Sequence, residues 1–232
     1  VYGRNDWKKI IKKETGRGNT LCLFLGNYLA SVDISSGEML RNLREIIEIA
    51  YSDQFSFKLL LGQHDMQYFT TRHGYSYYAT SMYRESVKNE AQSLFKKWDG
   101  YFEPCFQQGT TIFTNGPITK TWMEMFKASR TYKRYISDYT GRPLGFILKH
   151  QFDQHNISFL YSDRKTSSPL LSSASDKQVS DDIYISKMMT QIYTNSNESS
   201  YNRISYRAKD ITNTPILKTG NEGNTPYAIF ET

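Results

Sequence analysis

A strand–helix–strand pattern between residues 20 and 62 most constrains how this chain can fold. The apolar run TLCLFLG (20–26) predicts a buried strand, and FKLLLG (57–62) predicts a second one. In the segment between them, SSGEMLRNLREIIEIA (35–50), apolar residues recur at three- and four-residue spacing, as they do in an amphipathic helix. This order predicts a βαβ unit with two parallel strands whose carboxyl ends share one edge of a sheet.

Polar residues follow both strands at this edge. Asn27 comes after the first strand, and Gln63, His64 and Asp65 come after the second. Ligands of open α/β sheets bind outside the carboxyl ends of the strands. We therefore expect these four residues to face one another across a site.

The rest of the chain predicts further helices and strands. The segment 83–108 predicts two helices with Asp99-Gly100 between them, and TKTWMEMFKA (119–128) predicts another helix. GTTIFTNGP predicts a strand and loop, with the strand at 111–114, and PLGFILKHQF (143–152) predicts a strand. Three late strands are predicted at 188–196, 214–220 and 226–232.

No internal repeat and no domain boundary is evident, so we predict a single domain over residues 1–232. Within it, the Ser-rich stretch around 166–182 is expected to form a long irregular loop. No apolar run approaches the roughly 20 residues of a membrane helix, so no membrane insertion is expected. Cys22 and Cys105 are too far apart for a zinc site or a disulfide framework, which favours reduced thiols in an intracellular protein.

The net charge of +6 favours acidic partners such as nucleic acid. Four lysines lie close together on a short helix predicted near the N-terminus and form a candidate contact region: Lys8, Lys9, Lys12 and Lys13. The other basic residues are scattered, and this favours a solvated basic surface over a dedicated nucleic-acid face. RNA stays an alternative partner.

The motifs GNY, GQHD, TNGP and YTNS, in this order, resemble those of the calcineurin-like metallophosphoesterases, closest to a small Ser/Thr-protein-phosphatase-like branch. The resemblance covers most of the chain and is strongest over residues 19–126. It implies an α/β (α+β) fold, namely a metallophosphoesterase-like β-sandwich flanked by helices on both sides. In that family, two divalent metal ions held by Asp, His and Asn side chains clamp a phosphate and activate a water molecule.

Most of the metal ligands that the resemblance implies are replaced here. Asn27 stands where the family has a bridging aspartate, and Gln63 replaces a metal-binding asparagine. Two family histidines correspond to Asn115 and Asn195, and the family's first motif, Gly-Asp-x-His-Gly, is incomplete at VYGRNDW (1–7). Because hard divalent ions need carboxylate ligands, we expect no metal and no cofactor. The vestigial pocket, including the two residues that match the family, comprises Asn27, Gln63, His64, Asp65, Asn115 and Asn195.

The two matching residues are expected to serve the structure. For His64, a hydrogen-bonded structural role is favoured over that of a general acid or phosphate contact. Asp65 is expected to cap the turn that follows rather than to bind metal.

These observations predict a pseudoenzyme rather than an enzyme. We expect a structural or interaction subunit of a larger assembly, such as an organellar ribosome, a respiratory complex or a viral particle, with other protein subunits as partners. Its contact regions would be the helix Lys8 to Lys13 and the stretch 166–182. The location is expected to be intracellular, with mitochondrial and virion-associated locations both compatible. The alternatives are a residual metal-dependent phosphoesterase with His64 as its acid, and a basic nucleic-acid-binding module.

Overall fold

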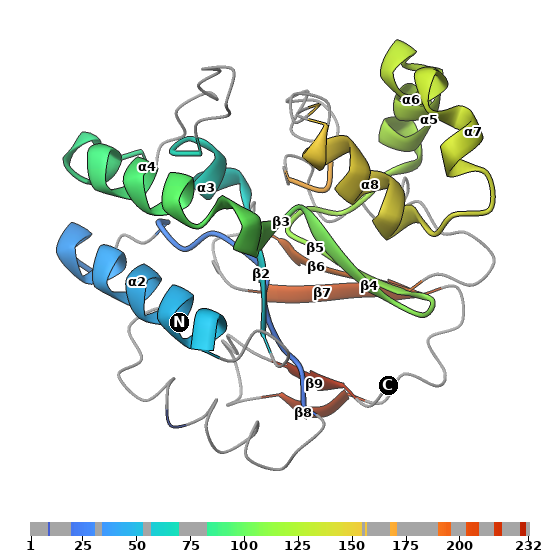
Figure 1. Ribbon diagram of the computed structural model, residues 1–232. Coiled ribbons are helices and arrows are strands. Elements are labelled where there is room, and N and C mark those ends of the chain that lie inside the picture. Colours follow the sequence, from blue (N-terminus) through green and yellow to red (C-terminus); the bar gives the residue numbers. More distant parts are fainter. Residues whose placement is uncertain are drawn as a thin grey trace. The chain divides into compact units, whose positions relative to one another are not determined.

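The structure is a computed structural model, shown in Figure 1, and its fold class is mixed α/β, as predicted. The chain divides into two compact units, Val1–Glu103 and Pro104–Thr232. The single domain and the β-sandwich stay predictions. The residues that the structure describes are 9, 20–30, 34–52, 57–69, 83–154, 156, 168–170, 190–195, 203–208, 216–219 and 228–230.

The first unit is built on a parallel sheet with the strand order β1-β2-β3 (Figure 1). Strand β1 is Cys22–Phe24, β2 is Phe57–Leu60 and β3 is Phe102–Glu103. Helix α2 (Ser36–Ser52) connects β1 to β2, which pair in parallel with Cys22 opposite Phe57. The predicted βαβ unit is therefore confirmed.

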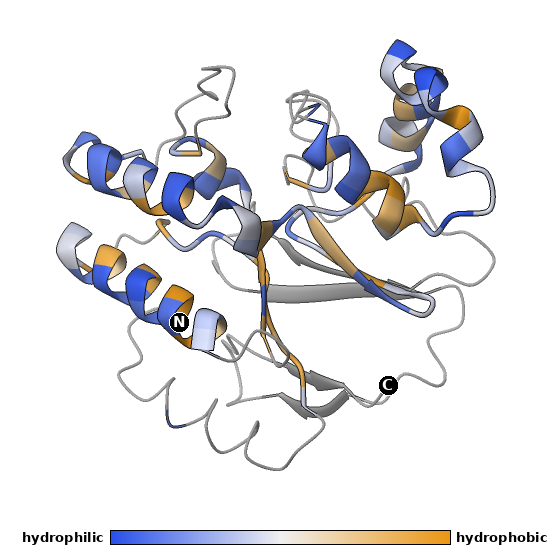
Figure 2. Ribbon diagram, viewed as in Figure 1, coloured by the Kyte–Doolittle hydropathy of each residue, from blue (hydrophilic) through white to orange (hydrophobic). Residues whose placement is uncertain are grey.

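Helix α2 forms where the apolar periodicity predicts it. Its start is capped by the Ser35 hydroxyl, which accepts a hydrogen bond from the Glu38 backbone N–H at 3.2 Å. Charged residues such as Arg41 and Glu48 lie on its exposed face. Figure 2 shows hydrophilic and hydrophobic residues alternating along the helix. The apolar side chains that α2 buries are Met39, Leu40, Leu43, Ile46, Ile47 and Ala50.

The described part of the first unit also contains short helices. They are α3 (Gln63–Met66), η1 (Glu85–Val87), α4 (Lys88–Lys97) and η2 (Asp99–Tyr101). The rings of Phe95 on α4 and Phe102 on β3 pack edge to face, with their centroids 5.0 Å apart. Helix α4 is thereby packed against the end of the sheet.

The second unit contains a four-stranded sheet with the order β4-β5-β6-β7 and a separate β8-β9 pair. The β5–β6 pair is parallel, and the β4–β5 and β6–β7 pairs are antiparallel. The strands are β4 (Cys105–Gln108), β5 (Thr111–Thr114), β6 (Thr190–Asn195), β7 (Arg203–Ala208), β8 (Ile216–Thr219) and β9 (Ala228–Phe230). The predicted strand at 111–114 and the three predicted late strands are confirmed, whereas β7 was not predicted.

Among the described residues, four helices lie between β5 and β6 in the sequence. Thr119 caps the first of them by accepting a hydrogen bond from the Trp122 backbone N–H at 3.2 Å. The Trp122 and Phe126 rings stack in the core with centroids 5.0 Å apart. The helices are α5 (Lys120–Ala128), α6 (Arg130–Arg134), α7 (Ile136–Tyr139) and α8 (Leu144–Asp153).

Two predictions of secondary structure are wrong. The segment after Gly100 forms strands β3 and β4 rather than a second helix, because β3 pairs with β2 and β4 pairs with β5. The segment 143–152 is helix α8 rather than a strand. Its side chains Ile147, Leu148 and Phe152 are buried at a spacing that fits one helical face.

Both predicted contact regions fall largely outside the described residues. Of the four N-terminal lysines only Lys9 is described, as helical and exposed, whereas Lys8, Lys12 and Lys13 are not. Of the stretch 166–182, only residues 168–170 are described, and these three are buried. In the described part of the chain, no helix combines the length and the apolarity needed to cross a membrane.

Candidate functional site

The loop after β1 and the turn after β2 meet through their backbones. Gly26 has a φ of 91°, and a Cβ atom at this position would lie 2.4 Å from the Gly62 nitrogen. Asn27 follows with a φ of 63°, a left-handed conformation that asparagine tolerates better than most residues. The amide residue at position 27 therefore suits the shape of this loop.

Asp65 joins the two segments through its carboxylate. Its Oδ2 atom accepts hydrogen bonds from the backbone N–H groups of Asn27 at 2.6 Å and Gly62 at 2.9 Å. Its Oδ1 atom accepts one from the Tyr28 N–H at 2.8 Å. The bond from Gly62 caps the start of α3, the helix that contains Asp65, rather than the turn that follows Asp65. The bonds from Asn27 and Tyr28 add a connection to β1 that the sequence did not indicate.

Burial dominates the protonation equilibrium of Asp65, whose side chain has no exposed surface. It raises the pKa of the carboxyl group to about 7, because moving a carboxylate out of water is costly. Backbone hydrogen bonds from Gly62, Asn27, Tyr28 and Leu29 lower the pKa but do not cancel the effect of burial. The carboxyl group is therefore protonated more readily than that of an ordinary aspartate.

His64 lies in the same corner and is neutral at pH 7. Burial lowers its pKa to about 4. The Gln63 side-chain nitrogen, which is a donor, lies 3.2 Å from His64 Nε2, so this ring nitrogen accepts a hydrogen bond. The backbone N–H of His64 donates to Asn27 Oδ1 at 3.3 Å. Gln63, His64 and Asn27 are thus linked by hydrogen bonds.

In the second unit, Asn115 and Asn195 lie at the carboxyl ends of two neighbouring strands. Asn115 is fully buried directly after β5, and Asn195 is the last residue of β6. The loop after β5 is fixed by the buried Gln191 amide, which accepts from the Ile118 N–H at 2.9 Å and donates to the Ile118 carbonyl at 3.0 Å. Because β5 and β6 are parallel, these two ends lie at one edge of their sheet.

The structure therefore brings together four of the six vestigial-pocket residues, namely Asn27, Gln63, His64 and Asp65. Asn115 and Asn195 belong to the other unit, and a site shared by all six stays a prediction. Among the residues that can be placed, no three His, Cys, Asp or Glu side chains gather closely enough to hold a metal ion.

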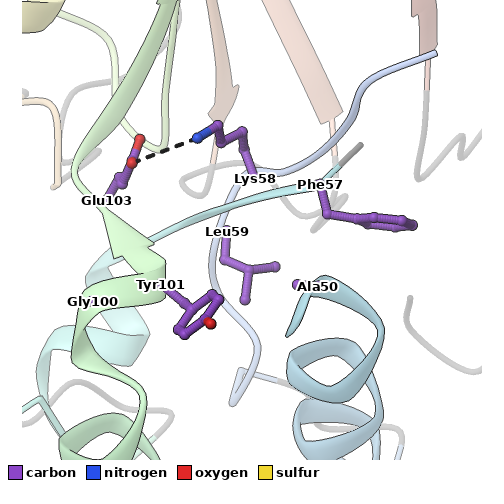
Figure 3. Close-up of a pocket in the computed structure, with 7 residues that line it drawn as sticks. All are labelled: Ala50, Phe57, Lys58, Leu59, Gly100, Tyr101 and Glu103. Carbon is purple, nitrogen blue, oxygen red and sulfur yellow. Dashed lines mark ion pairs between the residues drawn. The ribbon is translucent and has the colours of Figure 1, made fainter. Parts of the chain in front are cut away.

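A pocket of about 370 Å³ lies elsewhere in the first unit (Figure 3). Figure 3 shows Leu59 and Tyr101 on the side of Ala50, whereas Lys58 and Glu103 point toward each other as an ion pair at 3.8 Å. Sequence reasoning missed this pocket because residues 101–103 were predicted to be helical. The lining residues are Ala50, Phe57, Lys58, Leu59, Gly100, Tyr101 and Glu103.

A scan against protein-family models and searches of curated proteins and of solved structures found no match for this chain.

Proposed function

We propose that this protein is a catalytically inactive, metallophosphoesterase-like protein that acts through its surface as a subunit of a larger assembly. The main support for this proposal is that the Asp65 carboxylate is bonded to the protein backbone. Both of its oxygens accept backbone hydrogen bonds inside the fold. A divalent cation would have to compete with these donors for its ligand, and the neutral Asn27 amide would add no charge to hold the cation.

His64 supports the same conclusion. A general acid must carry its proton near the working pH, and efficient ones have a pKa close to that pH. Burial instead lowers the pKa of His64 to about 4, so its ring is almost entirely neutral at pH 7. Its contacts with Gln63 and Asn27 are those of a structural histidine.

The intact hydrophobic core supports a function that does not depend on catalysis. Helix α2 buries a complete apolar face, and β1 and β2 keep their parallel register. A fold that keeps its core while its loops carry amides in place of acids is best explained by a function that depends on shape. Organellar ribosomes, respiratory complexes and viral particles are the assemblies that we propose.

Two measurements test this function. In the first, the protein is isolated from its native source at moderate salt, and we expect other protein subunits to co-purify in stoichiometric amounts. Recovery of a monomer without partners would contradict the proposal.

The second measurement is turnover of an activated phosphodiester with added Mn²⁺, for which we expect no rate above background. Turnover that is lost in His64→Ala would instead establish the residual phosphoesterase. The matched control is Tyr51→Ala, which removes an exposed ring from α2 and leaves the loop and turn intact.

A further inference from the structure

Among the described residues, exposed positive charge is concentrated in the segment from α5 to α8 of the second unit. Residues 120–154 contain seven Lys and Arg residues, all of them exposed, against Glu124, Asp138 and Asp153. This segment therefore has a net charge of +4, out of +6 for the whole chain. The seven cations are Lys120, Lys127, Arg130, Lys133, Arg134, Arg142 and Lys149.

Three rings form a continuous row between two of these arginines. The His150 ring lies 5.0 Å from Tyr135 and 6.2 Å from Phe146, to which it is nearly parallel at 11°. The Arg134 guanidinium lies 5.5 Å from the centre of the Tyr135 ring, and that of Arg142 lies 5.1 Å from the centre of Phe146. We call these five residues the arginine–ring row.

Buried residues position the arginine–ring row, and parts of it remain exposed to solvent. The buried Tyr139 hydroxyl group lies 2.9 Å from His150 Nδ1 and also accepts a hydrogen bond from the Gln151 amide. Phe146 is nevertheless 42% exposed, and Ile136 beside Tyr135 is 55% exposed. Apolar surface that stays accessible among cations is a feature of binding surfaces, and prior ordering lowers the entropy cost of binding.

We infer that the arginine–ring row binds single-stranded nucleic acid. Unpaired bases stack on aromatic rings, and arginine contributes both phosphate contacts and stacking, so this row offers the two components of such a site. A duplex would hide the base faces, and an acidic protein would use the charge without needing the rings. None of the residues of the vestigial pocket belongs to this row, so nucleic-acid binding can be tested independently of the loss of catalysis.

The test is fluorescence anisotropy of a labelled, uridine-rich single-stranded RNA titrated with the full chain at several salt concentrations. Phe146→Ala removes the ring on which one base stacks and should weaken binding about 5- to 150-fold. Phe146→Leu keeps an apolar contact with the helix and should also weaken binding, which separates loss of the ring from loss of folding. The control Tyr51→Ala removes an exposed ring from the first unit and should leave the affinity unchanged.

Charge is tested in the same assay. Arg134→Gln and Arg142→Gln should each reduce the slope of log affinity against log salt by about 0.7, the value expected for one phosphate contact with a single strand. Arg41→Gln on α2, whose side chain is 63% exposed beside Glu38, is the matched control and should not change the slope.

Three results would overturn the inference. The first is an affinity of Phe146→Ala equal to that of Tyr51→Ala. The second is binding of a duplex of the same length as tightly as the single strand. The third is displacement of the RNA by polyglutamate that itself binds with the same dependence on Phe146, which would assign the surface to an acidic protein partner.

Discussion

The contact between the loop after β1 and the turn after β2 predicts a large effect of one added methyl group. In Gly26→Ala, the new Cβ would lie 2.4 Å from the Gly62 nitrogen and 2.7 Å from the Leu61 carbonyl carbon. Both neighbours are backbone atoms, so the clash cannot be relieved by rotating a side chain. The change also places alanine at a φ of 91°.

Two other glycines of the chain separate these two effects. Gly141 has a φ of 74° with open space around it, so Gly141→Ala should cost only the backbone strain, about 1–2 kcal/mol. Gly37 lies in α2 with neither strain nor close neighbours, so Gly37→Ala should stabilise the protein by about 0.5–1 kcal/mol. Gly26→Ala combines strain with overpacking and should cost about 2–5 kcal/mol.

The assay is urea unfolding of the three variants and the wild type, followed by circular dichroism under identical conditions. The expected order of the free energy of unfolding is Gly37→Ala, wild type, Gly141→Ala, Gly26→Ala, from most to least stable. Equal stabilities of Gly26→Ala and Gly141→Ala would show that the loop after β1 and the turn after β2 do not approach each other as closely as in the structure.

Three further predictions concern single side chains. His64 has a lowered pKa, so its contribution to stability is present above pH 6.5 and is lost as the pH falls toward 4, whereas Asp65 has a raised pKa, so its contribution is present below pH 3.8 and is lost as the pH rises through 7. Relative to wild type, His64→Gln should therefore gain stability as the pH falls, and Asp65→Asn should gain stability as the pH rises. Urea unfolding at several pH values should show a change of up to about 3 kcal/mol for each variant. If the stability difference from wild type changes with pH in the same direction for both variants, the prediction is contradicted. Gln191→Leu leaves the buried Ile118 N–H and carbonyl groups without their partner and should cost about 2–4 kcal/mol in urea unfolding, whereas a cost near zero would show that the amide does not fix the loop. Thr119→Ala removes the cap of α5 and should lower the free energy of unfolding by about 1 kcal/mol, while Thr119→Ser should keep most of it.

Local patterns explain which parts of the fold could be predicted. Helix α2 and the strands on either side of it have strong periodicity and apolar runs, and each was predicted close to its observed bounds. Strand β4 pairs with β5 in a hairpin across the two-residue turn 109–110, and Phe106 lies across from Phe113 with ring centroids 6.1 Å apart. Gly109, with a φ of 56°, is a local sign of this turn. Strand β3 instead depends on a partner far away in the sequence, because Phe102 lies opposite Leu59 of β2.

Helix α8 was predictable in principle. Leu148 and Phe152 are four residues apart, and Ile147 lies beside Leu148 on the same face, which is helical spacing. The short apolar run 146–148 alone is compatible with a strand as well as with a buried helix segment. Pro143, which occupies the cap position directly before α8, was a further sign of a helix start.

The candidate site was predictable in position but not in bonding. Parallel strands place Asn27 beside His64 and Asp65, as expected from the sequence alone. The bonds to the Asp65 carboxylate depend on the positive φ angles of Gly26 and Asn27, which direct backbone N–H groups toward it. The sequence indicates that these side chains lie close to one another, but it does not indicate which backbone groups bind the Asp65 carboxylate.

The most direct test of the central claim is the number of Mn²⁺ ions that the full chain binds, measured by equilibrium dialysis and elemental analysis. We expect no saturable binding of a metal pair and no difference between the wild type and Asp65→Asn, because the Asp65 carboxylate is bonded to the backbone. Two ions bound per chain, and lost in Asp65→Asn and in His64→Ala, would contradict the central claim.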